Sequence, residues 1–159
     1  MDILRMKKWK KFYDNIDHRT GLRVDFEKSV DPEVKRACKE FVLWLRSSIS
    51  FPMRVRVYVK ASKKIRAQDG ERVFGTCLLP YEREQEPYIR IATGDYQELV
   101  KKHGKDNALA RILFTIAHEL AHYFQWLNDL KLTPKGEERQ ATNYANRIID
   151  EYAETRDHP

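Results

Sequence analysis

Cysteine is scarce in this chain of 159 residues, and long apolar runs are absent. Cys38 and Cys77 are isolated and form no C-x-x-C pair, so we expect free, buried thiols in a reducing compartment. A cytoplasmic location follows from that expectation. No stretch approaches the run of about 18 uncharged apolar residues that a membrane span needs. No apolar run follows the charges of the N-terminus, so no secretory signal is predicted.

Glycine and proline are also scarce, with six of each, and neither occurs between residues 105 and 133. Nothing therefore interrupts a long helix in that stretch. The sequence contains no repeat and no low-complexity segment. Since a chain of this length can bury one sizeable core but hardly two, we expect a single domain over residues 1–159.

Acidic residues are fewer than basic ones: 24 Asp and Glu against 30 Lys and Arg leave a net charge of +6. The basic excess lies in residues 5–11, 54–66 and 101–105. A positive surface favours acidic protein partners or nucleic acid. No helix-turn-helix, zinc-finger or RNA-binding signature accompanies the charge, so a DNA-reading function is not predicted.

The most informative motif that is present is His118-Glu119-Leu120-Ala121-His122. Two histidines four residues apart lie on one face of a helix, where both imidazoles can reach one metal ion. Glu119 points about 100° round the helix and can serve as a general base. This is the zincin arrangement for peptide hydrolysis. An apolar back face at helical spacing is expected to pack on the core: Ile112, Ile116, Leu120, Phe124 and Leu127.

Zinc needs a third protein ligand, and the sequence restricts which residue supplies it. The metzincin solution requires Gly at position 125 and His at 128, where this chain has Gln125 and Asn128. The only later histidine is His158, near the end of the chain, so an acidic ligand is expected. The acidic residues considered are Asp129, Glu137, Glu138, Asp150 and Glu151.

Helix periodicity favours Glu138 among these acids. Thr133 can cap a new helix, Pro134 suits its first position, and the helix is expected to extend to about residue 154. Glu138 lies on its apolar-compatible face beside small alanines, so an inward carboxylate would need a metal or a charged partner. Glu138 is therefore the predicted third ligand, and Glu137, about 100° away, is the alternative.

Residues 114–123 (FTIAHELAHY) resemble the F-T-x-A-H-E-L-G-H segment of the ImmA/IrrE-type metallopeptidases. Residues 138–145 (ERQATNYA) are similar to the E-x-x-A-N-x-F-A helix of that family, whose Glu is the third zinc ligand. The resemblance covers about a quarter of the chain. It implies an intracellular zinc protease with His118, His122 and Glu138 as ligands and a DNA-binding regulator, such as a transcriptional repressor, as substrate.

The remaining patterns predict an α+β, zincin-like fold. A small, three-stranded mixed or antiparallel sheet, from residues 55–59, 72–79 and 88–92, should pack on the active-site helix. Asp31 and Pro32 predict the start of an earlier helix, and a short helix is expected at residues 96–103. Residues 1–16 carry apolar side chains at helical spacing among lysines, which predicts a basic amphipathic helix packed on the domain, or a basic arm.

The predicted activity is zinc-dependent hydrolysis of peptide bonds, with Glu119 moving the proton. An exposed edge strand, residues 72–79 or 88–92, can bind substrate as an added strand. Two alternatives stay open: a zincin-fold interaction module without activity, and a DNA-associated protease of the SprT-like kind. Glu119 argues against the first, and the missing third histidine argues against the second. Asp150 is a candidate hydrogen-bond partner that would orient the histidines. Four other residues are conceivable donors to the oxyanion: His103, Tyr123, Arg147 and Tyr152.

Overall fold

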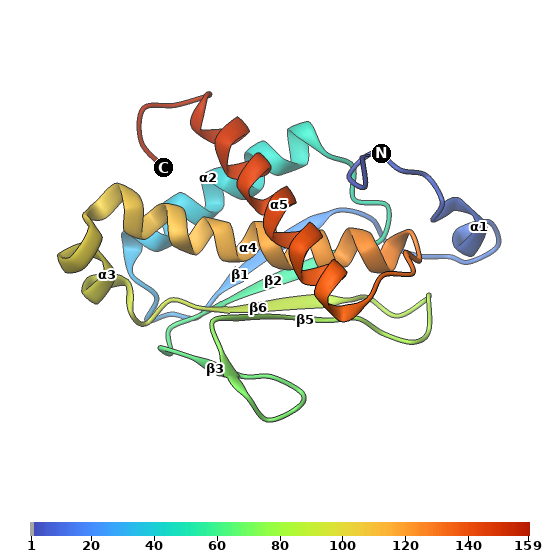
Figure 1. The fold of residues 1–159 in the computed structure, drawn as a ribbon, viewed down its shortest axis with the longest axis horizontal. Helices are drawn as coiled ribbons and strands as arrows, with labels where there is room; N and C mark the ends of the chain where they lie inside the picture. Colours follow the sequence, from blue (N-terminus) through green and yellow to red (C-terminus); the bar gives the residue numbers. More distant parts are fainter. Residues whose placement is uncertain (1) are drawn as a thin grey trace.

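The computed structural model describes residues 2–159, which form a four-stranded mixed sheet with helices stacked on one of its faces and a separate two-stranded hairpin (Figure 1). The strands are β1 (Leu22–Phe26), β2 (Val55–Lys60), β3 (Ile65–Arg66), β4 (Arg72–Val73), β5 (Gly75–Leu78) and β6 (Tyr88–Ala92). The helices are α1 (Lys10–Tyr13), α2 (Pro32–Ser48), α3 (Tyr96–His103), α4 (Lys105–Leu127) and α5 (Pro134–Ala153). No helix within residues 2–159 is long and apolar enough to cross a membrane.

The main sheet has the strand order β1-β2-β6-β5. The first three strands are parallel, and β5 pairs antiparallel with β6 at one edge. The predicted α+β class and mixed sheet are confirmed, but the prediction of three strands is wrong. The missed strand is β1, although Leu22 and Val24 alternate with charged neighbours at the period of two that a strand shows.

The predicted strand at residues 72–79 divides at Phe74. Arg72–Val73 pairs with β3 in a separate two-stranded hairpin, whereas Gly75–Leu78 joins the main sheet. The strand at residues 88–92 and the helix at 96–103 are confirmed at their predicted bounds. The alternation of Val55, Val57 and Val59 places three valines in the core beneath the helices.

The predicted N-terminal helix is mostly wrong: between residues 2 and 16 only Lys10–Tyr13 is helical, and Met1 lies outside the described residues. The apolar side chains nevertheless pack on the domain, since Ile3 and Leu4 are buried and Met6 and Trp9 contact the core. Tertiary contacts hold this segment in an irregular conformation. The Trp9 amide donates a hydrogen bond to Asn128 Oδ1 at 3.3 Å, and the Ile3 amide donates one to the Tyr144 hydroxyl at 3.0 Å.

Helices α4 and α5 position the candidate site. The predicted back face of α4 is buried as expected, and the helix ends at Leu127. Asp129, with a φ of 51°, then takes the left-handed conformation that lets the chain turn. Thr133 caps α5 by accepting a hydrogen bond from the Gly136 amide, as predicted. The chain thereby returns with α5 packed obliquely across α4 (Figure 1).

Candidate metal centre

His118 and His122 lie one turn apart on α4, and their rings point to the same side of the helix. The ring centroids are 5.0 Å apart. Their side chains are mostly covered, with exposed fractions of 17% and 13%. Burial and the neighbouring His122 lower the pKa of His118, so its imidazole is neutral near pH 7 and keeps a lone pair.

Glu138 reaches these two rings from the first turns of α5. Its Oε2 lies 3.1 Å from His118 Nε2, and its Oε1 lies 3.0 Å from His122 Nε2. One ligand atom from each of the three residues lies within 4.8 Å of the others, so His118, His122 and Glu138, called the metal group below, could hold a metal ion. Glu137 is not part of it. The expectation that Glu138 faces inward needs correction: its side chain is 65% exposed, at the outer rim of the group.

Gln125 fixes the orientation of His122, and the sequence analysis had assigned it no role. Its Nε2 donates hydrogen bonds to the Glu137 carbonyl and to Gln140 Oε1, both at 3.0 Å. Its Oε1 must therefore accept, and it lies 2.8 Å from His122 Nδ1. His122 thus carries its proton on Nδ1, which leaves Nε2 free to bind a metal. A polar residue three positions after a histidine, inside an apolar helix, was the available signal.

Glu119 projects from another side of α4 toward the edge strand β5. Its side chain is buried, and this burial raises the pKa of its carboxyl to about 7. A Cβ added to Gly75 would lie 3.4 Å from Glu119 Oε1 and 2.6 Å from Thr115 Cγ2. Gly75 therefore lets β5 approach the helix beside the carboxylate. A lone glycine inside a strand is a signal of such close approach.

The other acids considered do not join the group. Asp129 is held by Lys131 at 2.9 Å, and Glu151 by Arg147 at 3.1 Å. Asp150 was expected to orient the histidines. It lies about 18 Å along α5 from Glu138, at 1.5 Å per residue, so that prediction is wrong.

The conceivable oxyanion donors are also placed elsewhere, with one exception. Tyr123 is buried and donates its hydroxyl proton to the Met53 carbonyl, and Arg147 pairs with Asp2 at 2.9 Å. Tyr152 packs against Phe41, on the side of α5 that faces α2. Only His103 shares a cavity with residues next to the site.

That cavity lies beside the N-terminal half of α4 and has a volume of about 580 Å³. Phe114 and Thr115 line it one turn before His118, together with Phe74 and His103. A smaller cavity of about 210 Å³ adjoins His122 on the other side, where Leu79 and Trp126 line it. Both cavities border the outer edge strand. One cavity thus adjoins the turn of α4 before His118, and the other is lined by His122 itself.

Comparison of the chain with protein families, with curated proteins and with solved structures found no match.

Proposed function

We propose that the protein is a zinc metallopeptidase of the ImmA/IrrE type, in which His118, His122 and Glu138 bind the metal. The convergence of Glu138 on both histidines carries the proposal. Two imidazole nitrogens and a carboxylate oxygen are a ligand set that catalytic zinc uses. Each histidine Nε2 lies 3.0 or 3.1 Å from its own oxygen of Glu138, and ligand atoms about 2 Å from a tetrahedral zinc lie roughly 3.3 Å apart, so a small rearrangement would admit the ion.

Zinc at this group would supply a water of lowered pKa and polarise a substrate carbonyl. Glu119 follows His118 directly, lies beside β5 and is not a member of the ligand group. It would accept the proton of the attacking water and then give it to the leaving nitrogen. Because the carboxylate is buried, it would hold this proton away from bulk water until the proton passes to the leaving nitrogen.

An edge strand next to the metal group supports a protein or peptide as substrate. β5 is the outermost strand on this side, and β6, the other strand considered, is internal. The unpaired side of β5 can take an extended peptide as an added strand. Phe74, Leu79 and Tyr81 flank the edge and are 48%, 38% and 96% exposed, so apolar substrate side chains would find contacts there.

The substrate class completes the proposal. An intracellular protein, first of all a DNA-binding regulator, is what the resemblance of residues 114–123 and 138–145 to ImmA/IrrE-type peptidases implies. A cytoplasmic location agrees with two cysteines that form no disulfide.

The decisive experiment compares the wild-type protein with Glu119→Gln. Both are incubated with zinc and a peptide library derived from a bacterial proteome, and new peptide ends are identified by mass spectrometry. The variant keeps the shape of the side chain but lacks the base, so it should retain zinc and lose about 10²–10⁴-fold in rate. Equal cleavage by both proteins, or no cleavage by the wild type in the presence of bound zinc, would contradict the proposal.

A further inference from the structure

The sheet face opposite the helices, called the open face, is left uncovered by residues 2–159 except where the β3–β4 hairpin meets β6, at which Arg90 donates a hydrogen bond to the Arg66 carbonyl at 2.7 Å. Helices α2, α4 and α5 all lie on one side of the main sheet, and the β3–β4 hairpin projects from the other side (Figure 1). Side chains alternate across the strands, so the residues between the buried valines of β2 point to this open face: Arg56, Tyr58 and Lys60. The strand register places Arg23 beside Arg56 and Tyr88 on the other side of it.

Two tyrosines lie together at the centre of this face. The rings of Tyr58 and Tyr88 are 5.8 Å apart in an edge-to-face arrangement, and both side chains are partly exposed. The Lys60 ammonium lies 5.7 Å from the Tyr58 ring. Aromatic side chains on an open sheet are platforms on which unpaired bases can stack.

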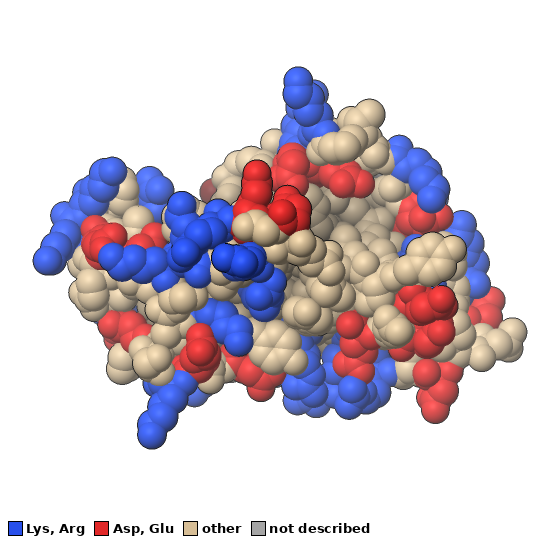
Figure 2. All heavy atoms as spheres, turned by 90° about the horizontal axis from the view of Figure 1, so that it is seen from below, with Lys and Arg blue, Asp and Glu red and all other residues tan. Residues whose placement is uncertain are grey.

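Arginines surround the tyrosines. Neither Arg23 nor Arg54 forms an ion pair with any residue between 2 and 159, whereas Arg56 pairs with Asp25 at 3.2 Å. Desolvation and the positive charges of Arg23 and Arg19 lower the pKa of Arg54, while the nearby carboxylate of Glu86 acts in the opposite direction. Figure 2 views this side of the molecule and shows Lys and Arg to the left of its centre and along its lower edge, with acidic side chains among them.

We propose that this open sheet face binds single-stranded nucleic acid. Tyr58 and Tyr88 stack on bases, and the unpaired charges of Arg23 and Arg54 bind phosphates. The face suits a single strand better than a duplex, because only unpaired bases expose their flat sides to an aromatic ring. The inference does not rest on the peptidase proposal, since none of these residues belongs to the metal group.

The test is binding of short fluorescein-labelled oligo-U and oligo-dT strands, measured by fluorescence anisotropy at several salt concentrations. The wild type should bind, and Tyr58→Ala or Tyr88→Ala should lower the affinity about tenfold. Tyr58→Phe keeps the ring and should bind like the wild type. The pair Arg23→Ala and Arg54→Ala should reduce the slope of log affinity against log salt by about 1.4, for two phosphate contacts.

The matched control is the pair Lys101→Ala and Lys102→Ala, which removes the same charge from exposed positions on α3. Thermal melts confirm that each variant folds. The proposal is overturned if the two double variants weaken binding equally, if a duplex binds as tightly as a single strand, or if the wild type binds neither oligonucleotide. Attachment to phosphatidylserine vesicles that depends on Arg23 and Arg54, without oligonucleotide binding, would show that the face recognises a lipid surface instead.

Discussion

At the scale of single residues, Gln125 and Asn128 occupy the two positions that a metzincin would give to Gly and His. Gln125 bonds to His122 and to the backbone of α5, and so links α4 to α5. Asn128 is buried, and its amide donates to the carbonyls of Ile3 and Phe124. One polar side chain therefore supports the metal group, and the other fastens the N-terminal segment to the end of α4.

Replacing Gln125 by Ala should lower the affinity for zinc about 10- to 100-fold, because His122 loses the partner that fixes its tautomer and ring orientation. The measurement is a zinc titration against a competing chelator. Gln140→Ala is the matched control, since Gln125 then still bonds to the Glu137 carbonyl and to His122. A control variant as impaired as Gln125→Ala would show that the effect comes from the helix contact and not from the histidine.

Adjacent acids on α5 allow a sharp test of the ligand set. Glu138→Ala should remove most of the bound zinc, because among residues 2–159 this carboxylate alone lies within about 3 Å of both histidines. Glu137→Ala should retain the metal, since Glu137 contributes its backbone carbonyl to Gln125 rather than its carboxylate to the group. Zinc content of the purified variants, measured by mass spectrometry of the metal, gives the result. Loss of zinc in Glu137→Ala with retention in Glu138→Ala would reverse the assignment.

At the scale of elements, the contact between α4 and β5 brings Glu119, the proposed general base, to the edge of the sheet. Gly75 permits that contact, because any side chain there meets Thr115 on the helix. Gly75 pairs with Ile91 of β6 in the sheet, so the strand cannot move away without losing its ladder. The strand and the helix are thus held at a distance set by the absence of one Cβ atom.

Gly75→Ala should therefore destabilise the protein by about 1–3 kcal/mol, the usual cost of overpacking a well-packed contact. The free energy of unfolding in urea measures the change. Adding Thr115→Ser removes the Cγ2 atom that the new methyl group meets at 2.6 Å, so the double variant should recover part of the stability. An unchanged midpoint in Gly75→Ala would mean that α4 and β5 separate easily.

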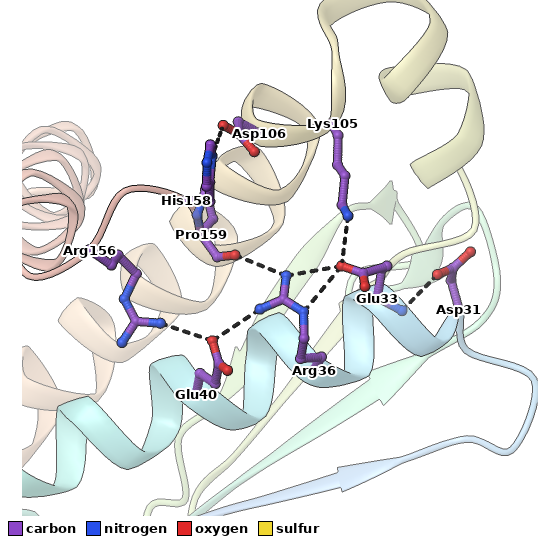
Figure 3. A network of polar contacts seen from close by, with 9 residues as sticks. All are labelled: Asp31, Glu33, Arg36, Glu40, Lys105, Asp106, Arg156, His158 and Pro159. Carbon is purple, nitrogen blue, oxygen red and sulfur yellow. Dashed lines mark hydrogen bonds and ion pairs between the residues drawn. The ribbon is translucent and has the colours of Figure 1, made fainter.

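At the scale of the whole molecule, a chain of polar contacts joins the last residues to α2 and to the start of α4 (Figure 3). Arg36 bonds to Glu33, to Glu40 and to the Pro159 carbonyl. Arg156 also bonds to Glu40 at 2.9 Å, and His158 Nδ1 lies 2.7 Å from Asp106. The end of the chain thereby closes one end of the helical layer, away from the metal group.

Because of this network, the free energy of unfolding should decrease both in acid, where Glu33 is protonated, and above the pKa of His158, where the imidazole loses its charge. Hydrogen bonds from Arg36 and Lys105 hold the pKa of Glu33 below its ordinary 4.5, so its contribution is present above that value and lost as pH falls through the folded pKa. The hydrogen bond to Asp106 raises the pKa of His158 above 6.5, so its contribution is present below 6.5 and lost as pH rises through the folded pKa.

Unfolding of the wild type and of His158→Gln, followed at several pH values, measures this effect. The difference in the free energy of unfolding should be present below pH 6.5 and disappear as the pH rises through the folded pKa of His158. Because these groups are exposed, the difference should be small and should shrink with added salt. Glu33→Gln serves as the control, since its difference should instead vanish in acid. If the difference in the free energy of unfolding between wild type and His158→Gln did not change with pH, the ion pair between His158 and Asp106 would not contribute to stability.

The sequence alone determined the features that depend on local spacing. About 3.6 residues per helical turn place His118 and His122 on one face. The same periodicity predicted the buried stripe of α4 and selected Glu138 over Glu137, although the side chain of Glu138 is more exposed than the pattern predicted. Caps at Asp31 and Thr133 marked where helices begin, because their side chains bond to backbone amides only two or three residues away.

Only the tertiary structure decided what depends on contacts between distant segments. The strand order β1-β2-β6-β5 leaves β5 at an exposed edge. The alternating apolar pattern of a strand does not show which other strand it pairs with, so this order could not be predicted from the sequence. Long-range packing overrode the helical pattern of residues 2–16. The meeting of Glu138 with the histidines depends on the turn at Asp129, and the partners of Gln125 depend on how closely α5 packs on α4. Such distances are set by side-chain packing between elements, which a local pattern does not contain.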